Sequence, residues 1–173
     1  MTAYAALLRA VNVGGTGKLA MTDLRKLCEA AGFESVKTYI QSGNVVFTSA
    51  LSEPKVKAKL EKALTAKLGK AAGVLVRTRS ELSDVLKRNP FPRAAPNRVI
   101  VLFVDELPAK KEIAAIPIPG TEQIAASGRE IFIHYPDGMG QSKLRVPFAK
   151  TGTGRNLNTV AKLAAMAGEL EAD

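Results

Sequence analysis

VKTYIQSGNVVFTS, residues 36–49, has the pattern of two strands joined by a tight turn. Two runs rich in β-branched and aromatic residues flank a short polar segment that contains Gly43, which can adopt the positive φ of a tight turn. We therefore predict an antiparallel hairpin at these residues. The rest of the first half of the chain can be arranged around it.

The elements predicted around this hairpin follow the order strand, helix, strand, strand, helix, strand. Residues 3–11 indicate a buried strand, and a helix capped by Thr22 runs to Ala31, where Gly32 ends it. After the hairpin come a lysine-rich helix within residues 55–70 and a strand at 74–78. This is the order of a ferredoxin-like unit, in which both helices cover one face of an antiparallel sheet.

The second half of the chain partly repeats this order. Residues 79–89 predict a helix ended by prolines, residues 98–105 a strand and residues 108–116 a short helix. AASGREIF at 125–132 then occupies the place of IQSGNVVF at 40–47, and a final amphipathic helix begins near Asn156.

The predicted fold class is therefore α+β, with tandem ferredoxin-like repeats, βαββαβ followed by a partial repeat, in two closely packed lobes. We expect a first lobe at residues 1–78, a connecting helix and proline-rich link at 79–97, and a second lobe with the C-terminal helix at 98–173.

Composition narrows the possible partners. The 173 residues are 46% hydrophobic, and no apolar run approaches the roughly 18 residues that a membrane helix needs, so we expect no membrane association. The single cysteine fits a reducing compartment and indicates a cytoplasmic protein.

The net charge of +9 favours a polyanionic partner such as nucleic acid. Much of this charge lies on the helix at 55–70, where the lysines surround an apolar stripe and would also form an ordinary solvated face. RNA-binding sheets present aromatic side chains, and Tyr4 and Phe47, the two candidates, have apolar neighbours that predict core positions instead.

LLRAVNVGGTGKLAM, residues 7–21, predicts an anion-binding loop. In a ferredoxin-like unit the loop after the first strand and the turn after the second lie at the same edge of the sheet. Glycines expose backbone N–H groups there, while amides and lysine add donors and positive charge. The polar and glycine residues that this places together are Asn12, Gly14, Gly15, Lys18, Gln41, Ser42 and Asn44. The alternative to an anion-binding loop is that these glycines only allow the chain to turn.

A second polar cluster, Arg155 and Asn156, stands at the start of the final helix. Asn156 is a helix cap by type, and Arg155 beside exposed N–H groups suits a phosphate or a carboxylate. We include both residues in the predicted binding site.

Nucleotide-binding motifs fit poorly. A Walker A loop fails at Asn12 and Leu19, and the dinucleotide pattern met by Gly15, Gly17 and Ala20 comes before the predicted helix start. We therefore predict no cofactor.

Catalytic patterns are equally sparse. His134 is alone in the chain and cannot form a multi-histidine metal site, and Cys28 has the spacing of a core residue. Asp105 and Glu106 have no third ligand in sight, and Asp137 has the context of a turn carboxylate. We predict no metal.

Three functions stay open. The first is binding of a phosphorylated small molecule or nucleic acid. The second is an enzyme acting on a small anionic substrate. The third is a non-catalytic interaction module.

Several blocks of the sequence resemble a bacterial family, the domain of unknown function 1697. They are LLRAVNVGGTGKLAMTDLRKLCEAAGF, VKTYIQSGNVVF, NPFP at 89–92, YPDGMGQSKL at 135–144 and GRNLNTVAKL at 154–163. The resemblance implies a two-lobed α+β fold with ferredoxin-like repeats and no assigned activity. The chain departs from the family pattern at Ala10, where glycine is usual, and at Leu157, where tryptophan is usual.

Overall fold

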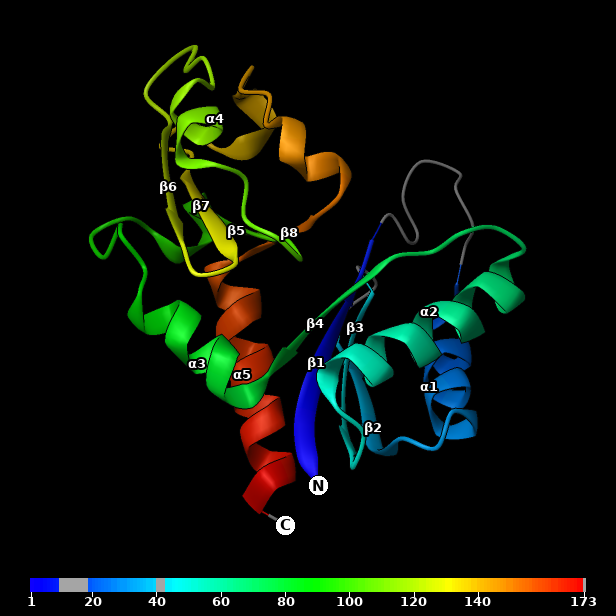
Figure 1. Ribbon diagram of the computed structural model, residues 1–173. Helices are drawn as coiled ribbons and strands as arrows, with labels where there is room; N and C mark the ends of the chain where they lie inside the picture. The colour runs from blue at the N-terminus through cyan, green and yellow to red at the C-terminus, as the bar shows by residue number, and fades with distance from the viewer. Residues whose placement is uncertain (10–18, 40–42, 173) are drawn as a thin grey trace. The chain divides into compact units, whose positions relative to one another are not determined.

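The computed structural model describes residues 1–9, 19–39 and 43–172 (Figure 1). The described residues divide into two compact units, which we call the first unit, Met1–Ser83 with Lys162–Asp173, and the second unit, Asp84–Ala161. The end of the chain groups with the first unit, and the predicted boundaries at residues 78 and 97 stay predictions. Within the described ranges, no helix combines the length and the apolar character that crossing a bilayer requires.

The first unit contains a four-stranded antiparallel sheet with strand order β2-β3-β1-β4. Its elements are β1 (Thr2–Leu8), α1 (Met21–Ala30), β2 (Glu34–Tyr39), β3 (Asn44–Ser49), α2 (Glu53–Leu68) and β4 (Val74–Thr78). Helices α1 and α2 pack on one face of this sheet (Figure 1). Tyr4 and Phe47 lie in the core that the sheet and these helices form, as predicted. The Tyr4 hydroxyl donates to Leu51 O at 2.7 Å.

Local sequence explains where these elements begin and end. Gly43 has φ +79° in the β2–β3 turn, and Gly69 ends α2 with φ +73°. Helix α1 begins at Met21 after an extended Ala20, so the prediction that Thr22 caps this helix is wrong. Asp23 in the first turn of α1 provides the negative charge that favours a helix N-terminus.

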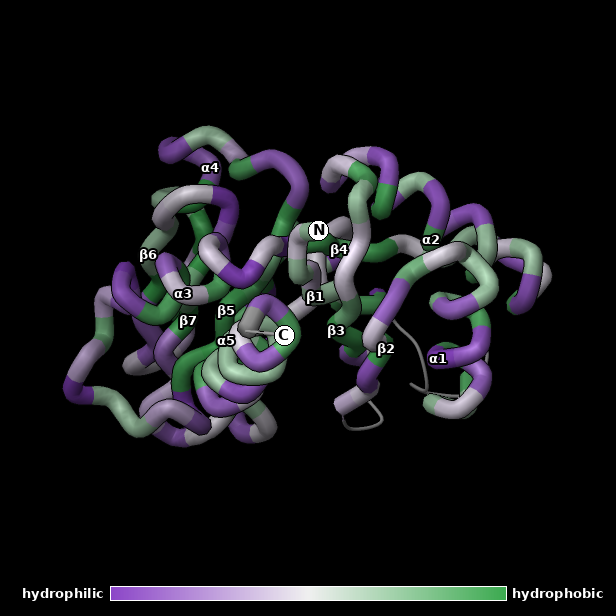
Figure 2. Tube along the Cα trace, turned by 90° about the horizontal axis from the view of Figure 1, so that it is seen from below, coloured by the Kyte–Doolittle hydropathy of each residue, from purple (hydrophilic) through white to green (hydrophobic). Residues whose placement is uncertain are grey.

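Helix α2 presents two different faces. Val56, Leu60 and Leu64 are buried at helical spacing, and Figure 2 shows hydrophilic residues alternating with hydrophobic ones along this helix. Five lysines of the predicted basic face are exposed, namely Lys55, Lys59, Lys62, Lys67 and Lys70.

The second unit contains another four-stranded antiparallel sheet, with order β6-β7-β5-β8. Helix α3 (Arg79–Lys87) begins in the first unit and ends in this one, and the strands and helix that follow are β5 (Val99–Phe103), α4 (Lys110–Ala114), β6 (Gln123–Ser127), β7 (Glu130–His134) and β8 (Thr153–Asn156). Helix α5 (Leu157–Ala172) begins in this unit, and its residues from Lys162 onward belong to the first unit. Three short 3₁₀ helices lie at Pro96–Arg98, Met139–Gln141 and Pro147–Lys150. Strand β8 is absent from the sequence-based prediction.

The two sheets correspond strand for strand. When β5, β6, β7 and β8 take the places of β1, β2, β3 and β4, the two strand orders become the same. Gly128 in the β6–β7 turn has φ +65° and matches Gly43, as the predicted equivalence of the two hairpins requires.

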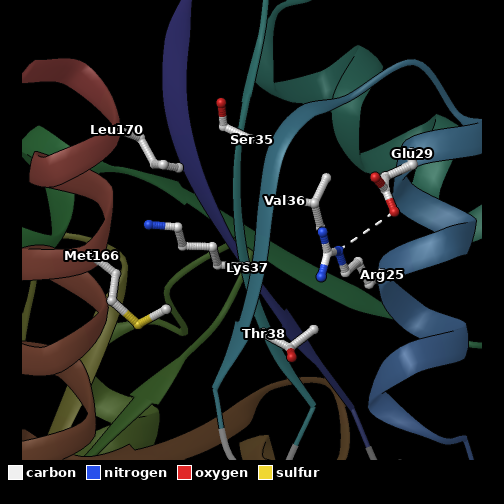
Figure 3. A pocket seen from close by; sticks show the side chains of 8 residues that line it. All are labelled: Arg25, Glu29, Ser35, Val36, Lys37, Thr38, Met166 and Leu170. Atoms are coloured by element: carbon white, nitrogen blue, oxygen red, sulfur yellow. Dashed lines mark ion pairs between the residues drawn. The ribbon is translucent and has the colours of Figure 1, made fainter. Parts of the chain in front are cut away.

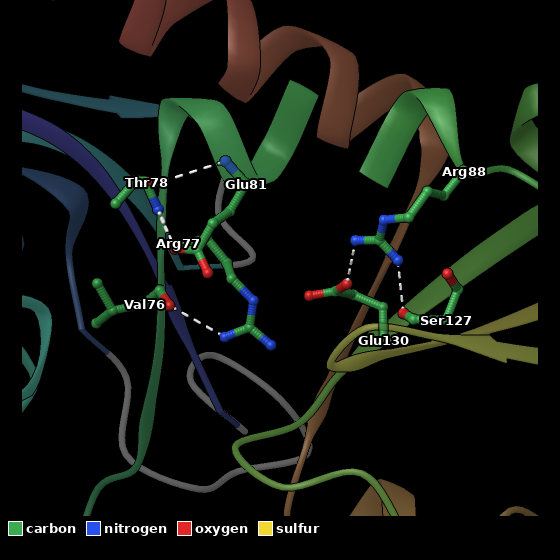
Figure 4. Close-up of polar contacts among 7 residues, drawn as sticks. All are labelled: Val76, Arg77, Thr78, Glu81, Arg88, Ser127 and Glu130. Atoms are coloured by element: carbon green, nitrogen blue, oxygen red, sulfur yellow. Dashed lines mark hydrogen bonds and ion pairs between the residues drawn. The ribbon is translucent and has the colours of Figure 1, made fainter. Parts of the chain in front are cut away.

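The two fourth strands also end alike. Arg77 in β4 donates from Nη1 to the carbonyl of the preceding residue, Val76, at 3.0 Å (Figure 4), and Arg155 in β8 does the same to Gly154 at 2.9 Å. Each strand then runs directly into a helix, α3 or α5. These shared details show that the likeness of the two units extends beyond strand order.

The helix caps at these junctions have the same spacing. Thr78 and Glu81 form a reciprocal capping box, with Glu81 N donating to Thr78 Oγ1 at 3.2 Å and Thr78 N donating to Glu81 Oε1 at 2.9 Å (Figure 4). At the second junction Thr159 N donates to Asn156 Oδ1 at 3.0 Å, which confirms Asn156 as the cap of α5.

Candidate functional site

The ends of three strands meet at one edge of the first sheet. Leu8 N at the end of β1 donates to Gly43 O at 2.9 Å, and Arg9 N donates to Gly73 O at 3.0 Å. The turn before β3 and the loop before β4 are thereby tied to the point where β1 ends. We call this place, formed by Arg9, Gly43, Asn44 and Gly73, the strand-end edge.

Arg9 provides the cation of the strand-end edge. A Cβ atom built on Gly73 would lie 2.9 Å from Arg9 Nη1 and 3.1 Å from Arg9 Cδ, so the arginine side chain lies directly against the glycine backbone. A larger residue at position 73 would have to displace the guanidinium. Arginine offers five donors in a planar fork that matches the oxygens of a carboxylate or a phosphate.

Helix α2 fixes the start of β4 beside Gly73. Lys57 Nζ pairs with Glu61 Oε2 at 3.1 Å and also donates to Val74 O, while Val74 N donates to Glu61 Oε2 at 3.0 Å. One carboxylate and one ammonium thus hold the first backbone groups of β4. The backbone against which Arg9 lies is therefore well anchored.

Asn44 is the predicted site residue that the structure places at this edge. Its side chain is fully buried, and Nδ2 donates to Tyr39 O at 3.1 Å across the β2–β3 hairpin. Asn44 also pairs with Leu7 in the sheet register. The amide therefore supports the turn that precedes β3.

Most of the predicted binding loop lies outside the described residues. This holds for Asn12, Gly14, Gly15, Lys18, Gln41 and Ser42, whose part in a site stays a prediction. The chain leaves the described part after Arg9 at the strand-end edge and is described again from Leu19, which is buried in the core beneath α1 and α2.

Arg155 and Asn156 lie in the second unit. Arg155 Nη1 donates to Thr153 Oγ1 at 2.6 Å and to Gly154 O, both uncharged acceptors. Burial lowers the pKa of the Arg155 guanidinium to about 10. Whether Arg155 and Asn156 bind a ligand stays a prediction.

Cys28 and His134 are the side chains that would first suggest a catalyst. Cys28 is fully buried, and burial raises the pKa of its thiol to about 12, so it is an inert core residue as predicted. His134 packs on Phe91 with ring centroids 5.6 Å apart, and its Nδ1 lies 3.5 Å from Gln123 Oε1. Among the described residues, no three His, Cys, Asp or Glu side chains are grouped as a metal site would require.

The sequence model of DUF1697, a protein family of unknown function, matches residues 1–132. The chain belongs to this family. A solved structure of a conserved bacterial protein from Streptococcus pneumoniae is similar to it, with a TM-score of 0.81 and 28% identity over 96% of this chain and 98% of that chain. No curated protein matches the sequence at a comparable level.

Two sequence blocks of this DUF1697 chain form ordered loops in the second unit. In NPFP, Phe91 N donates to Asn89 Oδ1 at 2.9 Å, which makes a compact turn stabilised by the asparagine side chain. The segment YPDGMGQSKL is held at both ends, because Arg98 Nη1 donates to Pro136 O at 2.9 Å and Ser142 Oγ donates to Glu122 Oε1 at 2.8 Å. These blocks therefore have a structural role in the fold.

A hollow of about 620 Å³ opens beside β2 in the first unit of the DUF1697 chain (Figure 3). Lys37 points from β2 toward Met166 and Leu170, whereas Arg25 on α1 pairs with Glu29 at 3.5 Å. Both side chains of that ion pair are more than half exposed, so water competes for their charges. Lys37 in this hollow therefore provides a control position for binding experiments at the strand-end edge.

Proposed function

We propose that the chain binds a small anionic or phosphorylated ligand at the strand-end edge. The observation that carries this proposal is the Arg9 side chain lying against Gly73, at the point where the glycine-rich segment leaves the described chain. A guanidinium next to a glycine-rich segment joins a fixed positive charge to backbone N–H donors, which is the chemistry of an anion-binding concavity.

In this proposal the ligand contacts come from the loop after β1 and from the turn before β3. The contacting residues are Asn12, Gly14, Gly15, Lys18, Gln41, Ser42 and Asn44. Arg155 and Asn156 lie in the second unit and are not part of this proposed site. Arg9 was missed by the sequence reasoning. The signal that could have found it is its place directly between an apolar strand and the glycine-rich segment.

The same proposal takes each unit as a ferredoxin-like repeat of one ancestral element. Support comes from the matching strand orders, from the two positive-φ glycines in the hairpins and from the matching arginines that precede the two helix caps. The second unit then lacks full counterparts of α1 and α2, because α4 has five residues and β7 is followed by a segment with two 3₁₀ helices.

A thermal-shift panel on the full chain tests the binding proposal. Pyrophosphate, glucose 6-phosphate and nucleotides are compared with sodium chloride at matched ionic strength. A ligand that binds only the native state raises the melting temperature. At a concentration 100 times its dissociation constant, it raises the free energy of unfolding by about 2.7 kcal/mol. A panel with no shift beyond that of chloride would contradict the proposal.

Nucleic acid is a second candidate ligand, because Lys55, Lys59 and Lys62 are exposed at successive turns of α2. Binding to a single-stranded oligonucleotide should then weaken steeply with salt and be lost when these three lysines become glutamate. Unchanged binding in the triple variant would rule out this face as the contact.

A further inference from the structure

The second sheet is covered less completely than the first on the corresponding face. In the first unit the segments between strands contain α1, with ten residues, and α2, with sixteen. The corresponding segments of the second unit contain α4, with five residues, and the two 3₁₀ helices after β7. The side chains that pack on this face from that second segment, Leu144, Val146 and Phe148, are only partly buried.

A cavity of about 320 Å³ lies on this face. Most of its walls are apolar side chains, which come from β5, β7 and the segment after β7. They are Ile100, Leu102, Ile133, Met139, Leu144, Val146 and Ala149. This volume is at the lower end of the range of roughly 300–1,000 Å³ that is usual for small-molecule sites.

The polar groups of the cavity are few and uncharged. Tyr135 and Asn156 line it, and burial raises the pKa of the Tyr135 hydroxyl, which therefore stays a neutral donor near pH 7. Arg155 also lines it, but the register pairs Arg155 with Val101, whereas Gly154 pairs with Leu102. Because strand residues alternate between faces, the Arg155 side chain projects from the opposite face of the sheet.

The walls of the cavity are held in place without a ligand. The Arg98–Pro136 and Ser142–Glu122 hydrogen bonds fix both ends of the loop that carries Met139, and Leu144 N donates to Ser142 Oγ at 3.0 Å. At the same time Met139 is 60% exposed, which leaves a flexible apolar side chain in water. Because the site is preformed, ligand binding loses little free energy to ordering of the protein.

We propose that this cavity is a binding site for a small, neutral, mostly apolar molecule with one hydrogen-bonding group. The volume sets the size of the ligand, the apolar walls select its body, and Tyr135 and Asn156 receive its polar group. A charged ligand would lose its hydration without a charged partner on the walls, so it is disfavoured. This site is independent of the proposed anion site in the first unit.

The test uses the full chain and N-phenyl-1-naphthylamine, a neutral aromatic amine that fluoresces in apolar surroundings. The wild type should bind it saturably, with one molecule per chain. Ala149 lines the cavity at an exposed position, so Ala149→Phe places an aromatic ring across its opening and should weaken binding at least about tenfold by taking the space of the ligand. The matched control is Ala58→Phe on the exposed face of α2, which should bind like the wild type.

A second measurement does not depend on the variants. In methyl NMR spectra of the wild type, the probe should shift the Ile100 and Ile133 methyl signals and leave Ile118, which is 42% exposed and is not a lining residue, unchanged. The proposal is overturned if the wild type shows no saturable binding, if Ala149→Phe binds as tightly as the wild type, or if Ile100 and Ile133 do not respond.

Discussion

Arg88 at the end of α3 should be a main support of the second unit. Its guanidinium donates through Nη1 to Ser127 O at 2.6 Å and through Nη2 to Glu130 Oε1 at 2.7 Å (Figure 4). The Glu130 side chain is 3% exposed and that of Arg88 is 32% exposed. One arginine therefore joins the helix to both sides of the β6–β7 turn and compensates a buried carboxylate.

Arg88→Ala should lower the free energy of unfolding by about 2–3 kcal/mol. Removing one partner of a fully buried ion pair costs roughly 3–5 kcal/mol, and the partial exposure of Arg88 reduces this because water can reach the vacated place. In a chain of this size the change corresponds to a fall of about 5–10 °C in melting temperature.

Urea denaturation followed by circular dichroism provides the assay. The variants are Arg88→Ala, Glu130→Gln and the double variant. The control is Arg79→Ala, since Arg79 and Glu171 form a pair at 3.4 Å whose side chains are both at least one-third exposed. The double variant should be more stable than the sum of the single effects predicts, because the two side chains interact directly. Additive effects, or an Arg88→Ala variant within about 0.5 kcal/mol of the wild type, would show that the Arg88–Glu130 pair does not support the second unit.

Three further predictions concern single positions. Ellman's reagent should not react with Cys28 in the native chain, and rapid native labelling would show that the thiol is accessible. The free energy of unfolding should fall, relative to that of Cys28→Ala, as the pH rises from about 9 towards 12. The reason is that the native thiol keeps its proton in this range while the unfolded one loses it. In urea denaturation Gly128→Ala should lower the free energy of unfolding more than Gly69→Ala does. A Cβ atom at Gly128 would lie 2.9 Å from Arg88 Nη1, whereas a Cβ atom at Gly69 would have open space. Equal losses of unfolding free energy would mean that only backbone strain matters at both positions. Asn156→Ala should cost about 1 kcal/mol through loss of the α5 cap, with Asn156→Asp restoring most of it in the same assay, and a silent alanine variant would contradict the cap.

The sequence was sufficient where local patterns decide the structure. The hairpins at Gly43 and Gly128 follow from turn chemistry between β-rich runs, and α2 follows from the spacing of Val56, Leu60 and Leu64. These features need no knowledge of distant residues. The order of elements in the first unit could therefore be predicted, together with the α+β class and the second unit apart from β8 and the short 3₁₀ helices.

The sequence was insufficient where pairing between distant residues decides the structure. Thr153–Asn156 contains a glycine and no apolar alternation, so its strand conformation comes from pairing with β5. The contact of Arg9 with Gly73 could not be predicted either, because Gly73 follows Arg9 by two helices and two strands. The observed N-cap of α1, Ala20, lies two residues before the expected cap, Thr22, which is a usual difference at helix ends.

Isothermal titration of three chains tests the proposed anion site most directly. With pyrophosphate as the probe, or the strongest stabiliser of the thermal-shift panel, the wild type is compared with Lys18→Ala and with Lys37→Ala, which removes a lysine from the hollow beside β2. We expect Lys18→Ala to lose about ten- to a hundredfold in affinity, the equivalent of one charge-assisted contact, and Lys37→Ala to bind like the wild type. Equal affinities in the wild type and Lys18→Ala, or a loss confined to Lys37→Ala, would contradict the proposed anion site.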